Sequence, residues 1–271
     1  MKTSKLCSVI FLALVLVLFV APARATITLS DSDSVVLIDP TSSAGIYSWS
    51  VDGVNQLAQQ WYWYRIGATG VAQSIDNLGL LSIVQALPDQ ATLSYGSATG
   101  LEVILKLTLD GGPVGSGLGD LDTQVQIDNH ASATTTVHFF EYNNFELNGV
   151  TGGQSVTLTG TPVNSAIQSN GLTSLAEEVA GPAPEEYEAA LTPVILNGLN
   201  TVSGYTLNDT ATAGPGDATW AFEWDKTLGH NGAYLLSKDE SLSVVVPEPA
   251  TIFGMGVILL AVGRKLRKTR V

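Results

Sequence analysis

The sequence has very little cysteine: the only one among its 271 residues is Cys7. It lies in a segment that we expect to be removed and precedes that segment's apolar run, so it is not a lipid-attachment site. The rest of the chain therefore has no disulfide. A region of about 220 residues is long enough to form a hydrophobic core without covalent cross-links. We expect a domain that is held together by packing.

Positive charge is scarce between residues 26 and 246. Only four of the 12 basic residues lie in this range, against 24 of the 25 acidic ones, which gives a net charge of about −20. Such a surface repels phosphates and anionic lipids, so binding to DNA, RNA or a membrane surface is disfavoured. It fits solubility, calcium or neutral glycans. The four basic residues are Arg65, Lys106, Lys226 and Lys238.

Catalytic signatures are also scarce. The sequence has no Gly-x-Ser-x-Gly elbow of a serine hydrolase, and its glycine-rich segment 115–120 lacks the lysine of a phosphate-binding loop. Its three histidines, His130, His138 and His230, are too scattered to suggest a zinc site. A glycosidase needs two carboxylates about 5–10 Å apart, but the many acidic residues single out no pair. These absences favour a protein without catalytic activity.

The first 25 residues have the three regions of a secretory signal peptide. Two lysines precede an apolar run at residues 9–20, and Ala23 and Ala25 form the small-x-small pattern that signal peptidase accepts. Cleavage after Ala25 would make Thr26 the first residue of the mature protein. The alternative is an uncleaved anchor, but about 12 apolar residues are short for a bilayer, which needs about 20.

The last 25 residues, 247–271, also have three parts. Pro247, Glu248 and Pro249 form an extended motif, because proline prevents helix or sheet from continuing through it. An apolar run at 252–263 follows, which we expect to form a short transmembrane helix, with an ordinary tail anchor as the alternative. A basic end then predicts a cytoplasmic C-terminus. Its basic residues are Arg264, Lys265, Arg267, Lys268 and Arg270.

This tail, with its motif, apolar run and basic cluster in order, resembles the PEP-CTERM sorting domain. The resemblance implies processing by exosortase, a membrane-embedded transpeptidase, in a gram-negative bacterium. It also implies a precursor tethered transiently to the inner membrane, followed by a location at the cell surface or in an extracellular polysaccharide matrix. Signal peptidase and an exosortase-like enzyme are the expected partners.

Residues 26–246 are predicted to form one all-β domain, an antiparallel β-sandwich of short strands. Hydrophobic residues alternate with others from Leu101 to Leu109, which is the period of a strand with one buried face. Asn-Gly pairs, which tolerate positive φ, favour tight turns between strands. They occur at Asn148-Gly149, Asn170-Gly171, Asn197-Gly198 and Asn231-Gly232.

One minor helical excursion from this sandwich is expected. It is predicted at residues 174–180 and 184–191, interrupted by Gly181-Pro182. Its five glutamates are expected to form a solvated face.

The segment Trp61-Tyr62-Trp63-Tyr64 is the most distinctive internal feature. In a strand the two tryptophans would face one side and the two tyrosines the other, so one pair could be exposed and stack on sugar rings. The competing interpretation is that these rings fill the core, which is commoner for large aromatic residues. They are therefore a candidate glycan platform, with burial as the alternative.

Three aspartates near the glycine-rich loop, Asp120, Asp122 and Asp128, are candidate calcium ligands. Calcium prefers carboxylate and carbonyl oxygens, although the spacing matches no EF-hand. No other metal or cofactor is indicated. Together, these features predict an exported surface or matrix protein that is structural or adhesive, with a secreted carbohydrate-binding or carbohydrate-active protein as the alternative.

Overall fold

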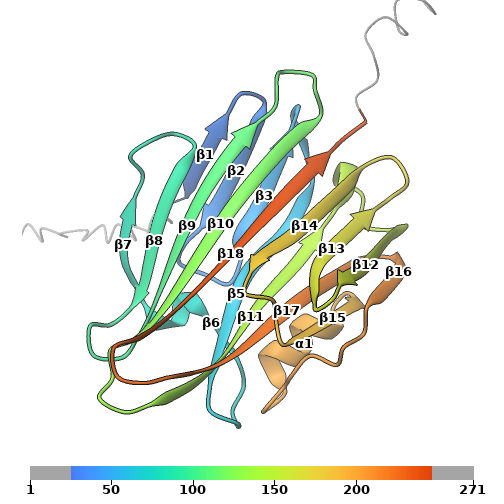
Figure 1. Ribbon diagram of the computed structural model, residues 1–271. Coiled ribbons are helices and arrows are strands. Elements are labelled where there is room, and N and C mark those ends of the chain that lie inside the picture. The colour runs from blue at the N-terminus through green and yellow to red at the C-terminus, as the bar shows by residue number, and fades with distance from the viewer. Residues whose placement is uncertain (1–25, 246–271) are drawn as a thin grey trace, which may run out of the picture.

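The computed structural model describes residues 26–245, whose strands form two sheets packed face to face (Figure 1). Sheet A has the strand order β1, β2, β3, β5, β11, β17, β15, with β4 paired to β3 and β6 paired to β5. Its strands are β1 (Ile27–Asp31), β2 (Ser34–Asp39), β3 (Gly45–Val51), β4 (Val54–Asn55), β5 (Leu57–Ile66), β6 (Gln73–Ser74), β11 (Thr135–Phe145), β15 (Glu186–Leu191) and β17 (Ala218–Leu228).

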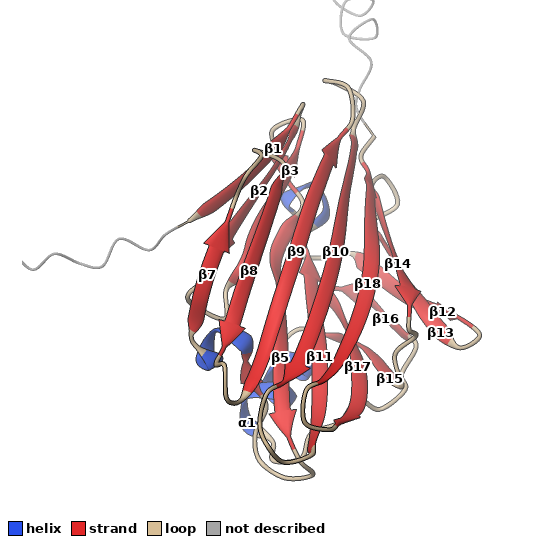
Figure 2. Cartoon of the chain, turned by 60° about the vertical axis from the view of Figure 1, so that its left-hand side comes forward, coloured by secondary structure: helices blue, strands red, loops and turns tan. Residues whose placement is uncertain are grey.

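Sheet B has the strand order β16, β12, β13, β14, β18, β10, β9, β8, β7. Figure 2 shows its long strands β9, β10 and β18 in front of β5, β11 and β17 of sheet A. Its strands are β7 (Leu80–Val84), β8 (Gln90–Gly96), β9 (Leu101–Gly111), β10 (Leu118–Asn129), β12 (Gln154–Gly160), β13 (Val163–Ser169), β14 (Ser174–Gly181), β16 (Thr212–Gly216) and β18 (Gly232–Ser243).

Pairing between neighbouring strands is antiparallel in both sheets except for a short parallel contact between β3 and β5. The predicted antiparallel β-sandwich is therefore confirmed. One α-helix, α1 (Val194–Thr201), and two 3-10 helices, Ile75–Leu78 and Leu147–Gly149, complete the elements of the described chain. Within residues 26–245, no helix is both long and apolar enough to cross a membrane. The predicted signal peptide and sorting tail lie outside the described residues.

The core lies between the sheets and follows from the alternation seen in the sequence. On β9, Val103, Leu105, Leu107 and Leu109 are buried and Lys106 is exposed. Each such side chain stabilises the fold by about 1.5–3 kcal/mol relative to exposure. Large aromatic residues fill much of the remaining interior, including all five tryptophans of the chain: Trp49, Trp61, Trp63, Trp220 and Trp224.

The helix predicted over residues 174–191 is wrong. The structure has strands β14 and β15 there, and the one α-helix begins at Val194. On β14, Leu175, Glu177 and Val179 point inward by strict alternation, and Glu177 is buried. The expectation of a solvated acidic face holds only in part, because Glu178 and Glu185 are exposed but Glu188 of β15 is buried like Glu177.

Three of the predicted Asn-Gly turns are confirmed by the backbone. Asn170-Gly171 connects β13 to β14, and Gly171 has a φ of 88°. Asn148 and Asn231 have φ values of 62° and 58°, a region that asparagine tolerates better than most residues. Asn197-Gly198, by contrast, lies inside α1. There the missing side chain of Gly198 makes room for the ring of Tyr205, which an added Cβ would strike.

Candidate functional site

A cluster of polar side chains lies on the outer face of sheet A. On β11, Phe139 points into the core, so the next residue back, His138, faces outward. The register between β11 and β17 places Asp225 directly opposite His138. Glu223 shares the face of Asp225, because residues two apart on a strand point to the same side. The His138 Nδ1 atom lies 2.5 Å from Asp225 Oδ1 and 3.4 Å from Glu223 Oε1.

The three residues differ in their access to solvent. The side chain of Asp225 is 34% exposed and that of His138 15%, whereas that of Glu223 is fully buried. A ligand arriving from solvent would therefore meet Asp225 and His138 first. Glu223 lies behind them as an inner group.

Burial raises the pKa of Glu223 to about 8, and the nearby carboxylates of Asp225 and Glu186 contribute to the rise. Hydrogen bonds from Thr206 and from the Leu207 N–H act in the opposite direction but are outweighed. At neutral pH most copies of Glu223 therefore carry a proton. A protonated carboxyl beside an imidazole and a second carboxylate can exchange protons with a bound molecule.

The segment that follows α1 covers Glu223. The Leu207 N–H and the Thr206 hydroxyl donate hydrogen bonds to Glu223 Oε2 at 2.9 and 2.8 Å, and Thr206 also bonds to Glu186. On β15, Glu188 accepts a hydrogen bond from the Tyr205 hydroxyl at 2.7 Å. This segment fixes the geometry of the cluster and closes it on one side.

A shallow cavity of about 280 Å³ adjoins the cluster. It is lined by Tyr64, Arg65, Ile66, Gln73 and residues 69–71, and Arg65 is the partner of His138 across β5 and β11. The guanidinium of Arg65 donates hydrogen bonds to the carbonyls of Gly67 and Tyr205. The volume of the cavity is just under the roughly 300 Å³ of the smallest typical ligand pockets.

The aromatic segment does not form an exposed platform. Trp61, Tyr62 and Trp63 are fully buried, so no sugar can stack on their faces, and the alternative of core packing is correct. Tyr62 stacks on Phe139 at a centroid distance of 5.5 Å. Trp63 donates a hydrogen bond from Nε1 to Asn200, which ties β5 to α1. Tyr64 is half-buried and lines the shallow cavity.

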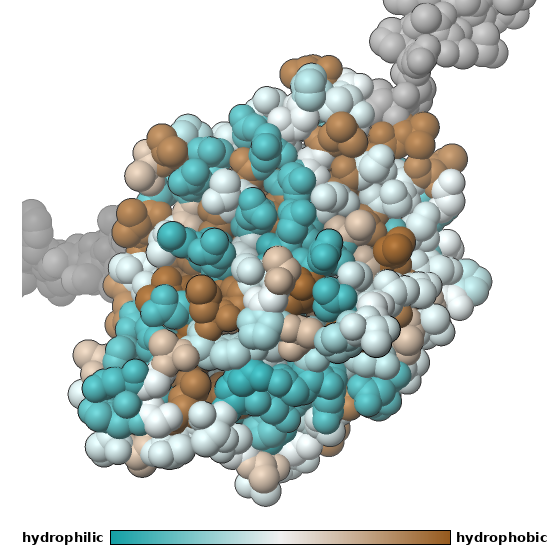
Figure 3. Space-filling model, in the orientation of Figure 1, coloured by the Kyte–Doolittle hydropathy of each residue, from teal (hydrophilic) through white to brown (hydrophobic). Residues whose placement is uncertain are grey.

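The three candidate calcium ligands do not lie together. Asp120 and Asp122 are neighbours on the outer face of β10, whereas Asp128 lies at the far end of that strand. Asp122 is opposite Asp239, and Asp120 is opposite Asp110. Burial and the adjacent Asp239 raise the pKa of Asp120 to about 7. Figure 3 shows this face of the molecule, with hydrophilic patches over the long strands of sheet B.

A second group of charges lies inside the sandwich. Lys238 forms ion pairs with Glu141, with Glu240 at 3.2 Å and with Glu177 at 3.6 Å, and all four side chains are fully buried. Gln60 donates hydrogen bonds to Glu240 and Glu141. Because these side chains are fully buried, a molecule in the solvent can reach this group only if the two sheets separate. Its role is therefore to join sheet A to sheet B.

Comparison with known proteins identifies a fold and no family. No family model matches the sequence, and no curated protein matches it. A bacterial glucoamylase solved in complex with acarbose matches with a TM-score of 0.57 at 8% identity, over 86% of this chain and 35% of that one. A putative aldose 1-epimerase from Escherichia coli K12 matches with a TM-score of 0.52 at 10% identity, over 82% of this chain and 99% of that one. At such identities the likeness establishes the fold alone.

Proposed function

We propose that this protein is exported and binds carbohydrate, and that the outer face of sheet A around His138 and Asp225 contacts the sugar. The observation that carries the proposal is the fold. Most of the chain superimposes on a glucoamylase solved with acarbose and on a putative aldose 1-epimerase. A fold hosts many functions, so the assignment depends on what the site itself offers.

The cluster on sheet A offers the groups that a polyol needs. The partly exposed Asp225 and His138 supply hydrogen-bonding atoms at the surface. The Asp225 carboxylate accepts hydrogen bonds from hydroxyls, and an imidazole nitrogen can donate or accept. The acidic surface suits a neutral glycan better than a phosphate or a sulfate, because it repels anions.

A second candidate function is proton transfer on the bound sugar, and the protonated Glu223 is the observation that favours it. Interconversion of sugar anomers requires a base at the anomeric hydroxyl and an acid at the ring oxygen. Glu223, with its pKa of about 8, would supply the acid, and Asp225 or His138 the base. Because Glu223 is fully buried, this activity requires the segment around Thr206 to move aside.

The proposed location is the cell surface or the extracellular polysaccharide matrix. Its support is the sequence alone: the signal peptide at 1–25 and the PEP-CTERM-like tail with Pro247, Glu248 and Pro249. Both lie outside the described residues. A role as a matrix protein that binds neutral polysaccharide accounts for both the proposed export route and the sandwich fold. The mass of the protein in wild-type and exosortase-deleted cells tests the route, and identical masses would contradict it.

The binding proposal is tested on a glycan array, with and without calcium, using the purified secreted protein. We expect retention on neutral glycans, and loss of retention in His138→Gln and Asp225→Asn. His230→Gln is the matched control, because His230 is exposed and outside the cluster. A purely structural or adhesive role without sugar recognition predicts a flat array for the wild type. Retention by His138→Gln equal to that of the wild type would place the sugar elsewhere.

A further inference from the structure

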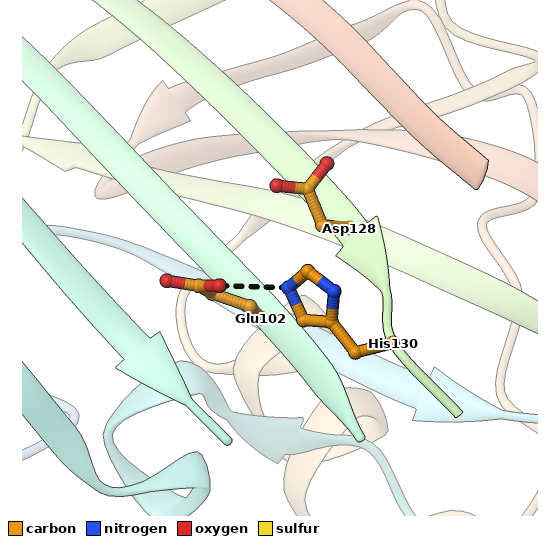
Figure 4. A group of neighbouring side chains, drawn as sticks. All are labelled: Glu102, Asp128 and His130. Atoms are coloured by element: carbon orange, nitrogen blue, oxygen red, sulfur yellow. Dashed lines mark hydrogen bonds and ion pairs between the residues drawn. The ribbon is translucent and has the colours of Figure 1, made fainter. Parts of the chain in front are cut away.

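A cluster of three side chains that can ligate a metal lies on the outer face of sheet B, away from the proposed sugar surface. Glu102 of β9 and Asp128 of β10 are direct cross-strand partners, and His130 follows two residues after Asp128 (Figure 4). One ligand atom from each lies within 4.8 Å of the others. His130 Nε2 is 2.8 Å from Glu102 Oε2. The three residues therefore converge on one point at the end of the strand pair.

The pairing of Glu102 with Asp128 is unfavourable without a cation. Like charges directly opposite each other on antiparallel strands destabilise a sheet. The other cross-strand partners of these residues, Gly96 and Ala233, carry no charge. Within residues 26–245, neither carboxylate forms an ion pair with a lysine or an arginine. His130 is the one ionisable partner of Glu102 among the described residues, and it can carry at most one positive charge against two carboxylates. The site thus has an excess of negative charge that a bound divalent cation would remove.

The backbone around the cluster is held in place before any metal binds. The side chain of Asn129 is buried and donates hydrogen bonds to the carbonyls of Ala133, Leu228 and Gly229. The His130 N–H donates to the Gly100 carbonyl at 2.8 Å. These bonds fix the position of His130 relative to β9. A preorganised ligand set binds its metal more tightly than a mobile one.

The neighbours of the cluster leave some of its ligand atoms free to bind a metal, and the cluster is open to solvent. Asp128 accepts a hydrogen bond from Gln126 through Oδ2 alone, at 2.7 Å, which orients the carboxylate. The side chains of His130 and Glu102 are 30% and 21% exposed, so an ion can enter and water can complete its coordination. Three protein ligands with an open position are a common zinc arrangement.

We propose that Glu102, Asp128 and His130 bind a zinc ion on the outer face of sheet B. The imidazole favours zinc over calcium or magnesium, which prefer oxygen ligands only. Zinc lies about 2.0–2.2 Å from nitrogen and carboxylate ligands, so tetrahedral ligands are roughly 3.4 Å apart. Zinc binding therefore requires His130 Nε2 and Glu102 Oε2, which are 2.8 Å apart, to separate slightly and Asp128 to approach them. The site is independent of the proposed sugar surface, which lies on the other sheet.

Isothermal titration of the purified, chelator-treated secreted protein with zinc chloride tests this site. We expect one zinc ion per chain, and at least tenfold weaker binding in His130→Gln and in Glu102→Gln. His230→Gln is the matched control, because His230 is an exposed histidine that contacts the carbonyl of Ala131, next to His130, but is not part of the ligand cluster. Circular dichroism of each variant separates loss of a ligand from loss of the fold. If one variant misfolds, the other still decides the question.

Three results would overturn the proposal. The first is a wild-type protein that takes up no zinc at micromolar concentration. The second is unchanged affinity in His130→Gln, which would mean that zinc binds elsewhere. The third is loss of zinc in His138→Gln alone, which would assign the ion to the cluster on sheet A. Anomalous diffraction at the zinc edge gives the position directly, and we expect the peak among Glu102, Asp128 and His130.

Discussion

Lys238 of sheet B forms an ion pair with Glu141 of sheet A inside the sandwich, and both side chains are fully buried. The two residues are 97 positions apart in the chain. Glu177 and Glu240 also face Lys238, so three carboxylates share one cation. Burial raises the pKa of Glu141 and of Glu177, and that of Glu177 rises further because of the charge on Glu141. These buried carboxyls therefore hold their protons to a higher pH than exposed carboxyls do.

Replacing Lys238 with methionine should destabilise the domain strongly. The substitution leaves buried carboxylates without their cation, and breaking a buried ion pair in this way costs about 3–5 kcal/mol. Urea denaturation followed by tryptophan fluorescence measures the loss. Lys106→Met is the control, because Lys106 is exposed on β9 and its replacement should change stability by less than about 0.5 kcal/mol. Equal effects from the two variants would contradict the account of the buried group.

Stability should fall as the pH rises from about 5 to 8. Glu223 has a folded-state pKa of about 8, above its ordinary value of 4.5, so the folded protein binds more protons than the unfolded one in this range. The stabilisation from this group is complete below pH 4.5 and lost as the pH approaches 8. In Glu223→Gln this titration is absent, so the free energy of unfolding should fall with pH less steeply than in the wild type, by about 1.4 kcal/mol per pH unit between pH 5 and 8. Denaturation at a series of pH values compares the slopes, and identical slopes would be inconsistent with the raised pKa.

Gly45 should not tolerate alanine. Its φ is +56°, and an added Cβ would overlap the ring of Trp61, which is fixed in the core. Gly53 is the matched control, because its φ is +78° but an added Cβ would meet no atom within 4 Å. Both variants carry backbone strain, and only Gly45→Ala adds a clash worth about 1–3 kcal/mol. Thermal melts should therefore separate the two variants, and equal melting temperatures would refute the clash.

The titration of Asp120 should depend on Asp239. Burial is the larger cause of the raised pKa of Asp120, and the hydrogen bond and charge of Asp239 are the next. Replacing Asp239 with asparagine removes that charge, so the pKa of Asp120 should fall from about 7 toward its ordinary value of 3.8. Carboxyl carbon NMR over pH 3–9 follows the change. No movement of the Asp120 titration would show that burial alone sets it.

Local pattern in the sequence was sufficient for the fold class. The alternation from Leu101 to Leu109 is visible within one segment, and the strand is where it predicts. The acidic run at 174–191 forms strands and not the predicted helix, and its alternation places Glu177 on the inward face. A buried glutamate becomes intelligible only through Lys238, which lies far along the chain and on another strand. The residues next to Glu177 in the sequence therefore cannot show that Lys238 is its partner.

The candidate site was only partly visible in the sequence for the same reason. Glu223 and Asp225 are two residues apart, a spacing that places both on one face of a strand. Their partner His138 comes from β11, and the register between β11 and β17 brings it there. The aromatic segment around Trp61 has the composition of a binding platform but packs in the core. Its burial depends on sheet B on one side and α1 on the other, which cover these rings only in the folded domain.

The three histidines of the chain allow the most direct test of the sugar-binding claim. His138 lies in the proposed sugar site, whereas His130 and His230 lie outside it. Imidazole NMR signals of the isotopically labelled protein, recorded during titration with a neutral glycan, report on all three at once. The account predicts that the signal of His138 moves with saturation and that those of His130 and His230 stay in place. Binding of a glycan without any movement of His138 would contradict it.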